Sequence, residues 1–305
     1  MDIINSNKLG AILLKNKLLV GSLFGICAAL SYATMATAVK LSGDVNVETL
    51  VFFRNIISLI LLSPLLLRKK ITIKTKRLSL HFIRAFFGML ALYSYFYAVK
   101  FLPLVNAILL ANTNTLFIPL VVLIWLKQRI PLRRALALGL GFFGIGLILQ
   151  PNLDFPVLPS IIGVSAGLFS AIALTSVRQL SKTEHTESIL FYFFVFAILI
   201  SFFPMVLRWE SFDPAMWGYI LIIGLFASLF QYFITKSYTY IPATKAGCLM
   251  FASVVFGGVY GFIFFKTLPN FLVITGSALV IVGSLIALLD KKEAISLSKK
   301  VKKKN

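Results

Sequence analysis

The sequence predicts an all-α polytopic membrane protein with ten transmembrane helices, arranged as two inverted five-helix repeats with both termini cytoplasmic. Three observations support this fold class: the composition, the long apolar stretches and the unequal charge of the segments between them. Of the 305 residues, 59% are hydrophobic and 13% are charged, whereas soluble domains contain about 25% charged residues. So little charge does not cover the surface of a soluble protein of this size.

Ten apolar stretches are long enough to cross a bilayer, which takes about 20 helical residues. Barrel strands alternate in polarity and are about half as long, so helices are predicted. The first stretch is too long for a signal-peptide core and no clear cleavage site follows it, which favours a retained helix. The predicted spans are 18–40, 47–67, 79–99, 103–126, 132–150, 158–179, 187–207, 215–235, 242–265 and 270–289.

The charges between the spans predict the orientation. The net charge is +20, and 24 of the Lys and Arg residues fall in the termini and in alternate loops, against four in the other loops. Cytoplasmic loops collect Lys and Arg, so both termini are expected in the cytoplasm. Because these cations sit in short loops, no nucleic-acid partner is expected. The basic tail 291–305 acts as a topology anchor or binds anionic membrane lipid.

An internal repeat is visible when the chain is shifted by about 139 residues. Glu48 then matches Glu187, and Lys127 matches Lys266. The repeats are predicted at 1–153 and 154–290, with 291–305 as a cytoplasmic tail. Five spans are an odd number, so two consecutive copies have opposite orientations in the membrane. Inverted repeats are frequent in secondary transporters, whose substrate site lies between the halves near the midplane.

Five segments are recognisable as motifs: Phe52-Phe-Arg-Asn55, His81-Phe-Ile-Arg84, Ala98-Val-Lys-Phe-Leu-Pro-Leu-Val-Asn-Ala107, Trp125-Leu-Lys-Gln-Arg-Ile-Pro131 and Phe265-Lys-Thr-Leu-Pro269. With them the chain resembles, over nearly its whole length, the EamA family of the drug/metabolite transporter superfamily. The segments around Arg54 and Arg84 also resemble those of S-adenosylmethionine uptake carriers. Many family members carry a glutamate after the fourth and ninth helices, where this chain has Gln128 and Thr267, so no role of that glutamate is carried over.

The resemblance implies a multi-pass transporter of the bacterial inner membrane, not an enzyme, with no cofactor. We expect a small organic substrate with an anionic group: an amino acid, a nucleoside-like compound or S-adenosylmethionine. The expected mechanism is alternating access, by uniport or exchange. The alternatives are a drug or amino-acid exporter and, in other classes, a membrane-embedded enzyme or a receptor. The chain is expected as a monomer or a homodimer.

Two arginines lie inside predicted spans. Arg54 follows Val47 by seven residues, about 10 Å into the bilayer at 1.5 Å per residue, and Arg84 lies equally deep from the opposite end of its helix. Intramembrane arginine usually faces a wet cavity or a partner. Either residue is a candidate clamp for a substrate carboxylate or phosphate. The alternative for both residues is snorkelling to the membrane interface, which is easiest for Arg84 because it lies close to a basic loop. A further alternative for Arg54 is a hydrogen bond to a carbonyl of a neighbouring helix.

Uncharged polar side chains supply the other candidate substrate contacts. Tyr32, Thr34 and Tyr95 are candidates for a cavity, where an aromatic ring stacks on a flat or cationic compound. The alternative for the tyrosines is the aromatic belt at the membrane interface. Asn112 and Asn114 lie about 200° apart on an ideal helix, so they tie their helix to two neighbours or mark a local irregularity beside a cavity. For Gln231 the two alternatives are likewise a place beside a cavity and a hydrogen bond to a neighbouring helix.

What the spans lack narrows the mechanism. None of the ten acidic residues lies deep in a span, although proton-coupled carriers commonly use buried Asp, Glu or His. This favours uniport or exchange over carboxylate-based proton symport. No Walker A sequence is present, so the chain is not expected to hydrolyse ATP itself. Cys27 and Cys248 lie in apolar stretches as buried free thiols, so no metal site is expected.

Overall fold

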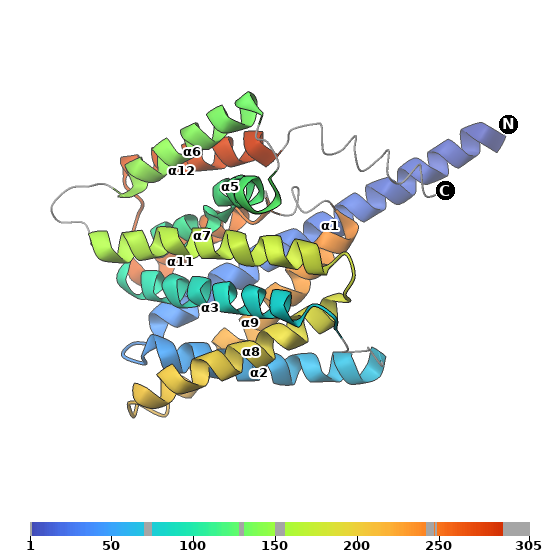
Figure 1. Ribbon diagram of the computed structural model, residues 1–305. Helices are drawn as coiled ribbons and strands as arrows, with labels where there is room; N and C mark the ends of the chain where they lie inside the picture. Colours follow the sequence, from blue (N-terminus) through green and yellow to red (C-terminus); the bar gives the residue numbers. More distant parts are fainter. Residues whose placement is uncertain are drawn as a thin grey trace.

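The computed structural model describes residues 2–69, 75–127, 131–149, 156–241, 247 and 249–288. All regular elements in these ranges are α-helices, which lie roughly side by side in one layered bundle (Figure 1). Predictions that rest on other residues, including Gln128, Cys248 and the tail 291–305, lie outside the described part of the chain.

The helices of the first half follow the predicted spans with two differences. They are α1 (Asp2–Leu41), α2 (Val47–Lys69), α3 (Leu78–Phe101), α4 (Leu104–Asn112), α5 (Asn114–Leu126) and α6 (Leu132–Leu149). The helix expected to begin at residue 18 begins at Asp2, because a helix continues beyond the apolar stretch that predicts the span. The span expected at 103–126 is matched by the apolar segment Leu104–Trp125, but its helix is interrupted at Thr113 into α4 and α5.

The second half repeats this order with α7 (Val157–Leu180), α8 (Thr186–Leu207), α9 (Met216–Tyr240), α11 (Ala252–Phe265) and α12 (Phe271–Leu288). α2 and α8 begin 139 residues apart, as do α6 and α12. Lys127 and Lys266, also 139 residues apart, end α5 and α11 in the left-handed conformation, with φ of 51° and 55°. A non-glycine residue adopts this conformation rarely, so the shared feature is a detailed structural correspondence between the halves.

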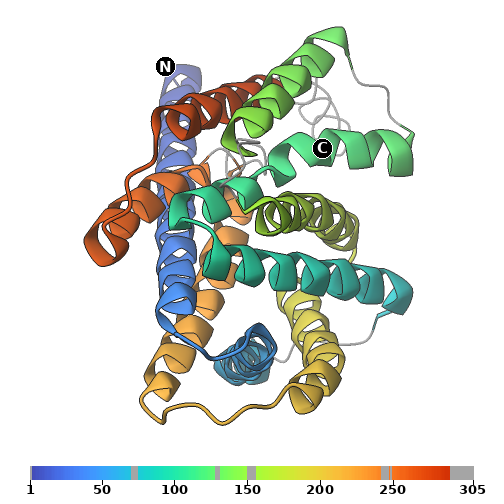
Figure 2. The same cartoon turned by 90° about the vertical axis from the view of Figure 1, so that its left-hand side faces the viewer.

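Helix packing follows the same correspondence. α1 packs most extensively on α9. In the repeat α1 corresponds to α7 and α9 corresponds to α3, and α3 likewise packs extensively on α7. α6 packs on α12, at a distance from α2 and α8. α2 lies between α8 and α9, as Figure 2 shows with α2 seen nearly end-on. The two halves therefore share one interface, and the deep residues of α2 and α3 face helices of the other half.

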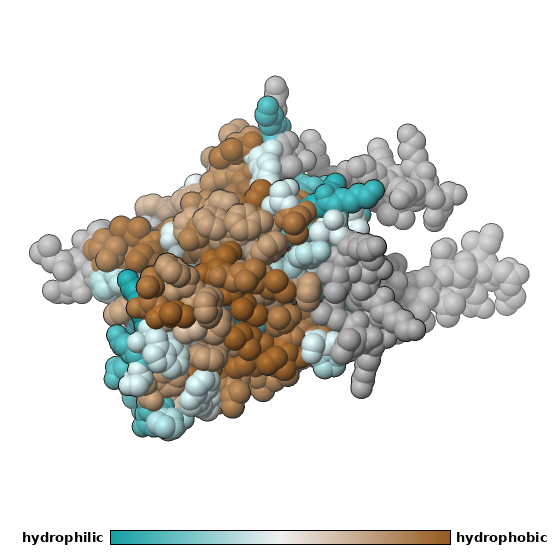
Figure 3. Space-filling view, turned by 60° about the horizontal axis from the view of Figure 1, so that its bottom comes forward, coloured by the Kyte–Doolittle hydropathy of each residue, from teal (hydrophilic) through white to brown (hydrophobic). Residues whose placement is uncertain are grey.

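The outer surface of the bundle is apolar. A broad hydrophobic area covers one flank, with hydrophilic residues gathered at its edges (Figure 3). Among the described residues, seven helical segments are long and apolar enough to cross a membrane, with α4 and α5 together forming one of them, and α6, α11 and α12 contain shorter apolar segments. In a bilayer the exposed leucine and phenylalanine side chains of these helices contact the hydrocarbon core.

Two contacts accompany the break at Thr113, one within α4 and one with α7. The Thr113 hydroxyl donates to the Leu110 carbonyl, 2.5 Å away, so a side chain satisfies a carbonyl at the end of α4. α7 approaches this point at Gly167, where an added Cβ would lie 2.1 Å from the Thr113 hydroxyl oxygen. Only a glycine permits this approach, which places the break against the other half of the molecule.

Candidate functional site

Arg54 is buried at the interface between the halves. It is 3% exposed, and its Nη1 donates to the side-chain oxygen of Asn55 at 3.3 Å. Its Nε has no hydrogen-bond partner among the described residues. The guanidinium also interacts electrostatically with Tyr32 of α1. It therefore does not snorkel to the membrane surface, and part of its donor capacity is unused.

Arg84 also turns away from the surface. Its guanidinium carbon lies 3.6 Å from the centroid of the Phe193 ring of α8. One turn farther along α3, a Cβ added to Gly88 would lie 3.3 Å from Arg84 Nη1, so the side chain extends towards the middle of α3. Arg84 is 7% exposed, and its Nε is unpaired within the described chain. The snorkelling alternative does not apply to this conformation.

Aromatic rings border the two arginines. Tyr32 stacks on Tyr95 of α3, with centroids 4.8 Å apart and an interplanar angle of 10°, and Phe230 of α9 lies 5.0 Å from Tyr32. The Tyr32 and Tyr95 side chains are close enough to interact, yet the Tyr95 hydroxyl makes no hydrogen bond of acceptable geometry with described residues. A polar rim of phenolic oxygens therefore adjoins Arg54.

The amide side chains have mainly structural partners. Asn112 donates to the Ser253 hydroxyl of α11 at 2.9 Å. Asn114 lies 3.4 Å from the Ser170 hydroxyl of α7. The two amides thus contact different neighbouring helices, and the helix is interrupted between them at Thr113.

The remaining candidates are more peripheral. The Thr34 hydroxyl lies 3.2 Å from the Tyr260 hydroxyl of α11 and 3.0 Å from the Leu30 carbonyl. Gln231 of α9 is half-buried, and no polar contact joins it to another described residue. The structure therefore brings together Arg54, Arg84, Tyr32 and Tyr95 and leaves the other four candidates outside this group.

Sequence reasoning missed three residues that shape the site. Asn55 binds Arg54, and its Nδ2 contacts the Met89 sulfur at 3.7 Å. Phe193 supports Arg84, and Gly88 leaves the space for that contact. Phe193 occupies the position 139 residues after Arg54, so the repeat offered a signal for it.

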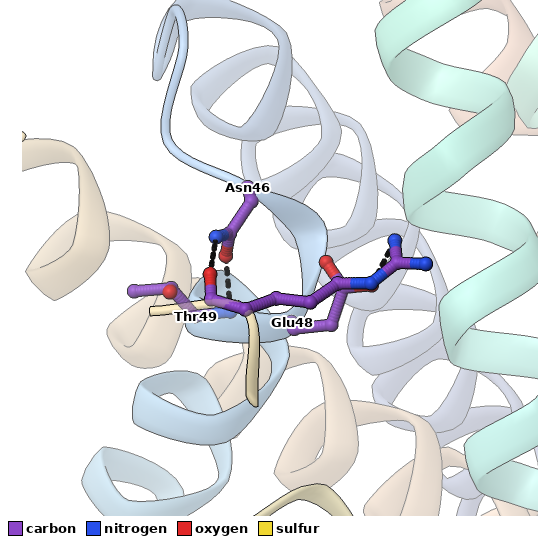
Figure 4. Close-up of polar contacts among 4 residues, drawn as sticks. Asn46, Glu48 and Thr49 are labelled. Carbon is purple, nitrogen blue, oxygen red and sulfur yellow. Dashed lines mark hydrogen bonds and ion pairs between the residues drawn. The ribbon is translucent and has the colours of Figure 1, made fainter. Parts of the chain in front are cut away.

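Two sets of polar contacts close the α2–α8 interface at its opposite ends. At one end, Arg208 pairs with Glu48 at 3.0 Å, and the Asn46 amide donates to the Arg208 carbonyl. Figure 4 shows Asn46, Glu48 and Thr49 at the start of α2, where the Asn46 side chain also accepts from the Thr49 amide at 2.9 Å. We call this set the first latch.

The second latch joins the segment before α3 to the segment after α7. The Thr75 hydroxyl donates to a Glu184 carboxylate oxygen at 2.6 Å, and Arg77 Nη1 donates to the Gln179 carbonyl at 3.2 Å. Glu184 precedes α8 as Asn46 precedes α2. The two latches therefore occupy corresponding places at the two ends of the interface.

Comparison with known proteins identifies relatives along most of the chain. The chain is 29% identical over 278 residues to the pseudopaline exporter CntI of Pseudomonas aeruginosa, covering 89% of this chain and 97% of the relative. It is 24% identical to a riboflavin transporter of Brucella anthropi, covering 85% and 95%. It is also 24% identical to an S-adenosylmethionine uptake transporter of Rickettsia felis, covering 80% and 84%.

A solved crystal structure with 18% sequence identity superposes with a TM-score of 0.64, over 88% of this chain and 96% of that one, which supports the fold. The EamA-like transporter family matches residues 19–150 and again residues 158–289. These matches confirm the resemblance read from the sequence. The protein is a multi-pass membrane transporter of the bacterial inner membrane and not an enzyme. The chain therefore belongs to the EamA-like transporter family.

Proposed function

We propose that the protein is a secondary transporter that moves a small organic metabolite with an anionic group by alternating access. The observation that carries the proposal is the pair of buried guanidiniums, Arg54 and Arg84. No carboxylate among the described residues forms an ion pair with either of them. A buried charge without a partner costs several kcal/mol, so a bound anion is the group that best compensates this pair.

The proposed membrane arrangement has ten spans in two inverted halves, at 1–153 and 154–290, with both termini cytoplasmic. The common 139-residue offset of helix starts and of the left-handed Lys127 and Lys266 supports it. In this orientation the first latch faces outward and the second latch faces the cytoplasm. The protein functions as a monomer or a homodimer.

Alternating access requires that the two ends of the interface open in turn. In the proposed cycle the contacts of the first latch break while those of the second latch remain. The contacts of the second latch then break after those of the first have formed again. Each latch consists of a few surface contacts, which are worth about 0–1 kcal/mol each. Contacts this weak allow the equilibrium between the two open states to be shifted by a bound substrate.

The substrate class remains an amino acid, a nucleoside-like compound or a compound like S-adenosylmethionine. The relatives support a metabolite substrate, since their names include both exporters and uptake transporters. Export of a drug or amino acid is the second candidate, favoured by the relative named as an exporter. The absence of deep carboxylates in the sequence favours uniport or exchange over proton symport.

The test is exchange by the purified full chain in proteoliposomes, against a broad panel of metabolites loaded inside the vesicles. Arg54→Ala should abolish uptake of the anionic substrate that the panel identifies, and Arg54→Lys should retain a measurable part. Gly146→Ala is a matched control, because an added Cβ there has no described atom within 4 Å. Unchanged transport by Arg54→Ala would remove Arg54 from the site.

A further inference from the structure

The contacts of both guanidiniums lead to the same turn of α3, at Gly88 and Met89. Arg54 contacts Asn55 at 3.3 Å, and Asn55 contacts the Met89 sulfur at 3.7 Å. Arg84 Nη1 lies 3.3 Å from an added Cβ at Gly88, the residue before Met89. Arg54 and Arg84 also repel each other electrostatically. Two positive charges from neighbouring helices therefore share one buried region.

Within the described part of the chain, no carboxylate forms an ion pair with either arginine. In the full sequence all ten acidic residues lie near the ends of the predicted spans or outside them; they are Asp2, Asp44, Glu48, Asp154, Glu184, Glu187, Glu210, Asp213, Asp290 and Glu293. The nearest titratable side chain on α3, His81, adds no negative charge. A ligand with one negative charge balances only one of the two positive charges.

The same charge balance discriminates among organic ions. An ammonium group of a ligand has no carboxylate to bind in this region, and both guanidiniums repel it. Like charges a few ångströms apart repel each other much more strongly in a buried region than in water. A zwitterion is therefore a poor ligand, although its carboxylate alone suits an arginine.

The free donors are also placed for two anionic groups. Phe193 supports one face of the Arg84 guanidinium at 3.6 Å, which leaves the edge and its N–H groups for another partner. Arg54 Nε is likewise unused. Planar guanidinium edges bind carboxylate or phosphate oxygens in pairs. The stacked rings of Tyr32 and Tyr95 lie near Arg54.

We infer that the substrate is an organic dianion, a dicarboxylate or a phosphomonoester, whose two negative charges are neutralised by Arg54 and Arg84. This inference rests on the proposed transport of an anion through this site and specifies the charge of that anion. Of the proposed substrate classes it retains a nucleoside-like compound that carries a phosphate, and it excludes amino acids and S-adenosylmethionine, which carry an ammonium group. The two arginines act together on one ligand, and a zwitterionic or singly charged relative of that ligand is selected against.

The experiment compares matched ligands as competitors in the proteoliposome exchange assay. One set is succinate, its monoamide succinamate and aspartate, which adds an ammonium group. The other set is adenosine 5′-monophosphate, its methyl ester and adenosine. In at least one set the dianion should compete at concentrations at least tenfold lower than the other two members. Such a result in the succinate set assigns a dicarboxylate, and in the adenosine set a phosphomonoester.

Other outcomes overturn the inference. If a monoanion, a zwitterion or a neutral compound is exchanged as well as its dianionic relative, or if neither dianion competes with a substrate from the panel, the substrate is not of this class. The proposed transport function survives such a result, because exchange itself is observed. Exchange of nothing in the broad panel would instead count against the proposed function.

Single charge removals provide the second measurement. Arg84→Gln and Arg54→Gln should each reduce the preference for the dianion over its singly charged relative at least tenfold. Arg84→Lys and Arg54→Lys keep the charge and should keep the preference. A structural role would lower transport of all ligands by the same factor, so an equal loss in the glutamine variants overturns the inference even where folding is impaired.

Discussion

Gly88→Ala is the sharpest perturbation of the arginine region, because it adds one methyl group at a known place. The new Cβ would lie 2.9 Å from Phe193 Cε2 and 3.3 Å from Arg84 Nη1. Carbon atoms in optimal contact are about 3.5–4.0 Å apart, so the Phe193 ring or α3 has to shift by about 0.6–1 Å. The side chain of Phe193 belongs to a well-packed helix and cannot swing away freely.

The magnitude follows from the contact that is lost. A cation–π contact of a desolvated guanidinium is worth about 2 kcal/mol. If the shift separates Arg84 from Phe193, the guanidinium loses its support and its orientation towards the ligand. Because 1.4 kcal/mol corresponds to a factor of ten in affinity, the apparent KM should rise by up to about 30-fold.

The assay is the concentration dependence of exchange in proteoliposomes, with the substrate that the panel identifies. Gly146→Ala and Gly139→Ala are matched controls, since an added Cβ at either has no described atom within 4 Å. Both controls should leave KM unchanged. If folded Gly88→Ala shows the same KM as these controls, Phe193 does not position Arg84 for substrate binding and the reasoning fails.

Two further predictions concern the latches and the broken helix. Glu48→Gln removes the ion pair with Arg208, whose side chain is 73% exposed against 17% for Glu48; this is worth at most about 1 kcal/mol. It should raise the rate at which an impermeant maleimide labels Tyr32→Cys from outside by up to about fivefold, in a background with Cys27→Ser and Cys248→Ser. Glu210→Gln serves as the control, and faster labelling from the inside would contradict the assigned side. Asn112→Ala and Ser253→Ala should each lower thermal stability, with a coupling energy of about 0.6 kcal/mol and at most about 1.7 kcal/mol in a double-mutant cycle. Loss of transport by Asn112→Ala with unchanged stability would instead place Asn112 in the substrate site.

The sequence by itself determined the class of protein and the course of the helices. The apolar stretches set the helix positions, because a backbone in lipid must satisfy its hydrogen bonds within each segment. The repeat was visible in pairs such as Lys127 and Lys266, whose shared left-handed conformation then appeared in the structure. Arg54 and Arg84 were identified from their depth alone, since an arginine inside a span requires a partner or water.

Only the tertiary structure decided how these residues are used. Helix periodicity places Arg84 on a face of α3 but does not say whether its long side chain turns to the surface or inward; Phe193 on α8 and the space at Gly88 decide this. The break at Thr113 likewise depends on Gly167 of a distant helix. Spacing along one helix cannot reveal such features, because they arise from contacts between halves that are far apart in the sequence.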